Sequence, residues 1–91
     1  DVKMAIAPIS AAHAKRLINR LRIAPVLAGA RGRPSADIDA LADTIAKLST
    51  LAAVLGPRLV ELDINPLIVR DNGGGVIALD ARATLAAASA A

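Results

Sequence analysis

The run from Asp37 to Pro57 constrains the fold more than any other part of the chain. Its apolar residues recur at alternating steps of three and four, the spacing of one buried face of an α-helix. Asp37, or Ser35 just before it, suits the N-cap, and Gly56 followed by Pro57 is a typical helix end. We therefore predict one long helix that packs through a single stripe. The stripe consists of Ile38, Leu41, Ile45, Leu48, Ala52 and Leu55.

Two further elements are predicted ahead of this helix. Large apolar residues alternate with small or charged ones over residues 2–7, which is the period of a β-strand. Ser10 is a natural N-cap, and apolar residues then recur at helical spacing up to about Ile23. Pro25 makes continuation of that helix unfavourable, so a loop is expected over 24–35.

The rest of the chain predicts a β-hairpin. One strand runs from about Arg58 to Val69 and the next from Val76 to about Arg82, with a turn rich in Gly, Asp and Asn at 71–75. An Ala-rich tail over 84–91 carries no readable chemistry. The element order βααββ predicts an α+β fold of two layers, an antiparallel sheet with two helices on one face.

Alternation of side chains along paired strands would gather polar groups on one face of this hairpin. Centring the turn at its Asn-Gly step places Asn65 opposite Asp80 and Asp63 opposite Arg82. The polar face would hold Glu61, Asp63, Asn65, Asp80 and Arg82. The opposite, apolar face would cover the helices with Leu62, Ile64, Ile68, Ile77 and Leu79.

Carboxylate and carboxamide oxygens on that face suit Mg²⁺ better than zinc or copper. Mg²⁺ usually takes one or two protein carboxylates and completes its shell with water and substrate phosphates. Asn65 and Asp80 are therefore candidate ligands of a metal–nucleotide site. The alternative is that Asp63 and Arg82 form a cross-strand ion pair and the remaining side chains are simply solvated.

Charge and composition limit the kinds of partner that this chain is expected to bind. The net charge is +3, and residues 2–36 contain seven Lys or Arg and no Asp or Glu. Such a basic half can attract a nucleotide or another phosphate-bearing partner, and the equally weighted alternative is a basic helix face that is simply solvated. Without aromatic residues to stack on bases, no nucleic-acid partner is expected.

The absence of cysteine excludes disulfides and thiolate metal sites. No apolar run reaches the roughly 18 residues of a membrane span and no signal peptide is evident, so we expect a cytoplasmic protein.

The hairpin resembles the metal-binding end of the ATP-grasp domain of NDP-forming acyl-CoA synthetases, which are related to the succinyl-CoA synthetase β subunit. The matching motifs are ELDINPL at 61–67 and VIALDAR at 76–82. LAGARGRP at 27–34 and the segment 37–41 resemble the connecting segment of the same family. The resemblance covers nearly the whole chain, and it implies that residues 1–91 are the C-terminal part of an ATP-grasp domain, a partial ATP-grasp fold within a longer chain.

The resemblance also implies roles for individual residues. Asn65 and Asp80 would ligate Mg²⁺ bound to the phosphates of ATP or ADP, and Asp63 would be an auxiliary ligand. Further candidates for phosphate contact are Arg31, Arg33 and Arg82. The parent enzyme would interconvert acyl-CoA, ADP and phosphate with acid, CoA and ATP through a phosphohistidine on another domain.

The implied partners are the remaining ATP-grasp lobe, the CoA-binding and ligase domains, and a small acyl substrate. CoA itself would be bound by another domain, and this chain alone is not expected to catalyse a reaction. Two alternative functions belong to other classes of protein. The chain could be a regulatory synthetase-like module of a protein acetyltransferase, or a non-catalytic interaction domain that binds a partner through its helix stripe.

Overall fold

The computed structural model describes residues 1–87, and its longest element is helix α3 (Ile38–Leu55). Asp37 is the N-cap, and its side chain accepts a hydrogen bond from the backbone N–H of Ala40 at 3.1 Å. Gly56 ends the helix with a φ of +54°, a conformation that glycine adopts without steric cost. The bounds predicted for this helix are confirmed.

Helix α1 (Ala11–Asn19) begins where predicted, because the Ser10 hydroxyl accepts a hydrogen bond from the N–H of His13. The prediction that this helix continues to about Ile23, with a loop after it, is wrong. A second short helix, α2 (Ala24–Leu27), and a 3₁₀ turn, η1 (Ala30–Gly32), occupy most of that loop. Pro25 lies in the first turn of α2, where its missing N–H needs no partner within the helix.

The core lies between α1 and α3. Ala14, Ile18 and Ala42 are its buried residues. Alanine at two of these positions lets the helices approach closely. The partly buried residues packed around them are Ile9, Leu27, Ile38, Leu41 and Ile45.

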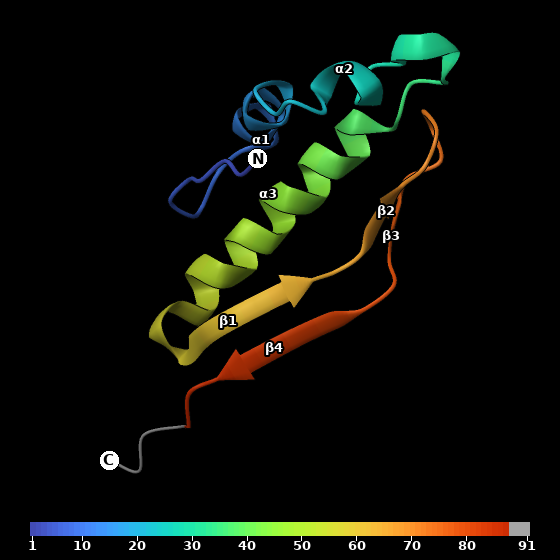
Figure 1. Ribbon diagram of the computed structural model, residues 1–91. Coiled ribbons are helices and arrows are strands. Elements are labelled where there is room, and N and C mark those ends of the chain that lie inside the picture. Colours follow the sequence, from blue (N-terminus) through green and yellow to red (C-terminus); the bar gives the residue numbers. More distant parts are fainter. Residues whose placement is uncertain (88–91) are drawn as a thin grey trace.

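A long β-ribbon follows α3 and the 3₁₀ turn η2 (Gly56–Arg58), and it consists of two antiparallel pairs. Strand β1 (Leu59–Ile64) pairs with β4 (Ala81–Leu85), and β2 (Leu67–Val69) pairs with β3 (Val76–Ala78). Figure 1 shows the ribbon running along α3, with α1 on the other side of that helix and α2 near its N-terminal end. The α+β class with both predicted helices on one side of antiparallel strands is confirmed.

The predicted register of the ribbon is also confirmed. Asp63 pairs with Arg82, and Ile68 pairs with Ile77 across the second pair of strands. The register shifts only at a bulge between Leu59 and Glu61. Strand β4 extends to Leu85, so the first residues of the predicted tail belong to the ribbon, and residues 88–91 of that tail lie outside the described part.

The hairpin differs from the prediction in being interrupted at Asn65 and Pro66. Proline has no N–H to donate to a ladder, and the buried side of the ribbon changes there. Leu62 and Ile64 are half-buried before the break, whereas odd-numbered residues, Leu67 and then Val69, are half-buried after it. The prediction that Ile68, Ile77 and Leu79 cover the helices is therefore wrong: they are 42%, 41% and 63% exposed.

The strand predicted over residues 2–7 is not formed. The side chains of this segment do alternate between two sides, because Lys3, Ala5 and Ala7 line a hollow beside α1 and α3. The large side chains of this segment face outward, however: Val2, Met4 and Ile6 are 80%, 88% and 92% exposed. A strand needs a hydrogen-bonded neighbour, and the ribbon lies on the opposite side of α3 (Figure 1). No helix within residues 1–87 is both long and apolar enough to cross a membrane.

Candidate metal site

The break in the ribbon brings together the residues that the sequence singled out. Asn65 follows β1, and Asp80 precedes β4. The backbone N–H of Asn65 donates a hydrogen bond to the carbonyl oxygen of Asp80 at 3.1 Å, and Leu79 donates to the carbonyl of Pro66 at 3.0 Å. The two candidate ligands therefore face each other across the ribbon, as predicted from the register.

One hollow contains all three predicted metal ligands. It has a volume of about 220 Å³ and is lined by Asp63, Asn65, Asp80, Ala81 and Arg82. The five residues are exposed to solvent. A ligand can therefore reach the polar side chains without any rearrangement of the backbone.

The oxygens of this hollow are not engaged by an ion pair. Asp63 and Arg82 are partners in the register, but the ion pairs within residues 1–87 join other side chains. These pairs are Lys3 with Asp1, Lys15 with Asp39, and Lys47 with Asp43. The alternative that Asp63 and Arg82 neutralise each other is thus not what the structure shows, and both groups remain available to a ligand.

The donor set fits Mg²⁺ that arrives with a phosphate ligand. It consists of the carboxylates of Asp63 and Asp80 and the carboxamide oxygen of Asn65, all hard oxygen donors. In the described part of the chain, no three His, Cys, Asp or Glu side chains form a group that could hold an ion. The hollow is therefore not a closed protein cage, and water or phosphate oxygens would have to supply the remaining ligands of an ion bound there.

The three arginines predicted to contact phosphate are separated in the structure. Arg82 lines the hollow with the carboxylates, whereas Arg33 lines a different one with Val69 and Asp71. Arg31 lies in η1 with a φ of +62°. Figure 1 shows η1 beyond the N-terminal end of α3, far along the ribbon from the break. Of the three, only Arg82 shares the candidate metal site.

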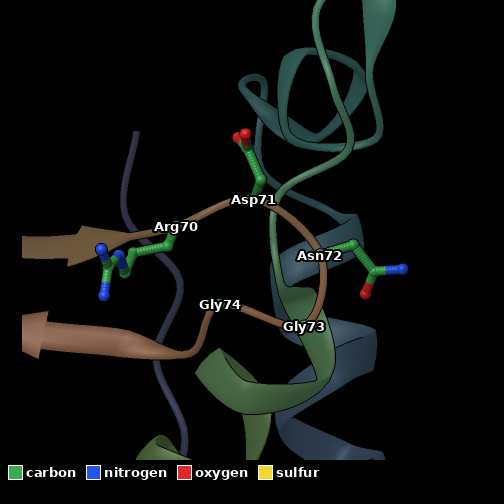
Figure 2. A pocket seen from close by; sticks show the side chains of 5 residues that line it. All are labelled: Arg70, Asp71, Asn72, Gly73 and Gly74. Carbon is green, nitrogen blue, oxygen red and sulfur yellow. The ribbon is translucent and has the colours of Figure 1, made fainter.

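A larger hollow of about 700 Å³ lies at the turn between β2 and β3, lined by residues 70–74. Figure 2 shows that the side chains of Arg70, Asp71 and Asn72 point away from one another. No set of donors converges on a single point there. The smaller hollow by the break, where the polar side chains share one lining, is therefore the better candidate for a metal site.

The capping role predicted for Asp37 is confirmed, but Asp37 also has a second contact that its sequence neighbours do not indicate. Its carboxylate also accepts the N–H of Gly75 at 2.8 Å, across 38 residues of sequence. The N–H groups of Gly75 and Ala40, with a smaller effect of Gly73, lower the pKa of Asp37 and outweigh the effect of burial. No local pattern could have revealed this contact, because the turn is distant in the sequence.

Comparison with known proteins gives a consistent family. Residues 1–85 match the family model described as ATP-grasp domain. The chain is 40% identical over 85 residues to the β subunit of an ADP-forming acetate–CoA ligase (II) of Pyrococcus furiosus, covering 93% of this chain and 36% of the relative. It is 41% identical over 81 residues to a trans-feruloyl-CoA synthase from an unknown prokaryote, covering 89% and 11%.

Two solved structures have the same fold over this region. A crystal structure from Pyrococcus horikoshii gives a TM-score of 0.82 at 36% identity, covering 88% of this chain and 33% of that one. The dinucleotide-forming acetyl-coenzyme A synthetase 1 of Ca. Korarchaeum cryptofilum, in complex with coenzyme A and Mg-AMPPCP, gives 0.80 at 29% identity, covering 90% and 37%. The chain thus spans about a third of the length of the β subunit and of these two structures.

Proposed function

Because the chain belongs to the ATP-grasp domain family, we propose that it is the Mg²⁺–nucleotide-binding lobe of an NDP-forming acyl-CoA synthetase. The observation that carries the proposal is the hollow in which Asn65 and Asp80 face each other across the ribbon. Relatives that share this region include ADP-forming acetate–CoA ligases, and one similar structure contains Mg-AMPPCP and coenzyme A.

In this proposal, Asn65 and Asp80 hold the metal from two neighbouring strands, and Asp63 is an auxiliary ligand or binds a metal-bound water. Mg²⁺, when bound, neutralises charge on the phosphate oxygens as the phosphoryl group moves. Among the described residues, no acidic side chain forms an ion pair with the Arg82 guanidinium. In this proposal, Arg82 donates N–H groups to a phosphate oxygen at the rim of the hollow. The chain's own contribution is therefore positioning and electrostatic stabilisation.

The complete enzyme needs more than these 91 residues. We propose that the second ATP-grasp lobe, the CoA-binding domain and the ligase domain supply the rest of the cleft and the phosphohistidine. The reaction would be the interconversion of acyl-CoA, ADP and phosphate with acid, CoA and ATP. The solvent-exposed hollow supports this proposal, because its side chains alone do not enclose a ligand.

The test uses Asp80→Asn and Asn65→Ala in the complete enzyme. Both should reduce Mg²⁺-dependent ATP formation by orders of magnitude while the thermal unfolding temperature stays unchanged, because both side chains are exposed. Glu61→Gln is the matched control: Glu61 is exposed on β1 but does not line the hollow. Activity of Asp80→Asn equal to that of the unmodified enzyme would exclude the metal assignment.

A further inference from the structure

Asp37 connects two parts of the molecule that are far apart in the sequence. Within the described residues it is the one buried charged side chain, at 8% exposure. One carboxylate oxygen accepts the N–H of Ala40 at 3.1 Å, and the other accepts the N–H of Gly75 at 2.8 Å. The same side chain thus starts helix α3 and holds the turn between β2 and β3.

The backbone around Asp37 reinforces this connection. The N–H of Asp37 donates to the carbonyl of Arg70 at 2.7 Å, and the N–H of Asn72 donates to the carbonyl of Ser35 at 2.8 Å. Ala36 forms an isolated antiparallel bridge with Asp71. Figure 2 shows the turn lying directly beside the segment that leads into α3.

The ribbon that carries the metal ligands is held mainly at its two ends. At one end η2 joins it to the C-terminal end of α3, and toward the other end β3 contacts α3. Strand β4 is exposed along its whole length, so little packing fixes the ribbon near Asp80. The break at Asn65 and Pro66 lies between these two attachments, where the two strand pairs end and two backbone hydrogen bonds, Asn65 to Asp80 and Leu79 to Pro66, connect the chains.

We propose that Asp37 is a positioning residue for the metal site: by clasping the β2–β3 turn to the start of α3, it fixes the orientation of the ribbon at Asn65 and Asp80. The inference rests on the proposed function, because it assigns Asp37 to the support of that same site. Asp37 does not line the metal hollow, so in this proposal it acts through the ribbon and touches no reacting group.

The substitution Asp37→Asn separates the two roles of Asp37, capping α3 and holding the β2–β3 turn. The side-chain oxygen of Asn can still cap α3, since Asn is as good an N-cap as Asp. Its amide –NH₂, however, would face the N–H of Gly75, donor against donor. Asp37→Ser is a second variant that keeps a capping hydroxyl but is too short to span both partners. Asp39→Asn is the matched control, because Asp39 lies on the first turn of α3 and its exposed carboxylate pairs with Lys15 on α1.

The experiment measures two properties of each variant in the complete enzyme. Hydrogen exchange reports the protection of residues 70–75, and titration with Mn²⁺ in the presence of ADP, followed by electron paramagnetic resonance, reports metal affinity. Asp37→Asn and Asp37→Ser should speed exchange in the turn and weaken Mn²⁺ binding by roughly tenfold, the scale of lost support around a metal site. Asp39→Asn should change neither property.

Faster exchange with unchanged Mn²⁺ affinity would overturn the positioning role, and unchanged exchange would overturn the clasp itself. Asp80→Asn in the same titration keeps the two proposals distinguishable. If Asp80→Asn binds Mn²⁺ as the unmodified enzyme does, the proposed function fails, and the positioning role fails with it. If Asp80→Asn loses binding while Asp37→Asn and Asp37→Ser keep it, only the inference about Asp37 fails.

Discussion

Asn65 and Asp80 are joined by a backbone hydrogen bond of 3.1 Å at the point where the β-ribbon is interrupted. That bond fixes the two residues opposite each other, and both side chains line the same hollow. The candidate ligand pair is thus arranged by strand register, and the residues that line the hollow are exposed to solvent.

Asp63 should contribute to metal binding less than Asp80 does. In the complete enzyme, Asp63→Asn keeps the size of the side chain and removes one carboxylate from the hollow. We expect the Mg²⁺ concentration needed for half-maximal activity to rise roughly tenfold, with activity recovered at high Mg²⁺. A titration with Mg²⁺ at fixed nucleotide measures this, and an unchanged Mg²⁺ requirement would remove Asp63 from the site.

The 91-residue chain by itself should bind Mg²⁺–ATP weakly or not at all. Two or three oxygen ligands on an open surface compete poorly with the hydration of Mg²⁺ unless the rest of a cleft holds the phosphates. Isothermal titration calorimetry of the isolated chain tests this. Micromolar affinity would contradict the proposal that a second lobe completes the site.

The contact between Asp37 and Gly75 should depend on pH in the acidic range. Because the folded-state pKa of Asp37 is lowered, its stabilising effect is complete above the unfolded value of about 3.9. The effect is lost as the pH falls through the lower, folded-state pKa. The amide proton shift of Gly75, followed by NMR, should therefore titrate with a midpoint below the ordinary Asp value. The titration should disappear in Asp37→Asn, and a midpoint at or above that ordinary value would contradict the prediction.

Gly74→Ala should loosen the turn for a steric reason. A Cβ at Gly74 would lie 2.9 Å from the Cβ of Arg70 and 2.9 Å from the carbonyl oxygen of Asp71, and the backbone oxygen cannot move freely. We expect the turn to lose about 1–3 kcal/mol of local stability, measured as faster hydrogen exchange over residues 70–75. Asn72→Ala is the control, because the Asn72 side chain is exposed in the same turn and its backbone N–H can still donate to the carbonyl of Ser35. An equal effect of both changes would show that the close contact at Gly74 is not the cause.

Local patterns determined much of this protein. The stripe from Ile38 to Leu55, with Asp37 before it and Gly56 after it, was sufficient to predict α3 and its ends. The Gly-rich turn and the two-residue period of the strands predicted the register that pairs Asp63 with Arg82. These features follow from the sequence because hydrophobic periodicity, capping and turn geometry act over a few residues.

Tertiary structure decided the features that depend on distant neighbours. Residues 2–7 have the period of a strand, but no described strand lies beside them to complete a ladder. Beyond the break at Pro66 the buried side of the ribbon changed, which left Ile68 exposed and Val69 half-buried. The bond from Gly75 to Asp37 spans 38 residues, and only the packing of the ribbon along α3 brings the turn to the helix start. Each of these features depends on which surfaces meet in space, and a residue's sequence neighbours do not specify that.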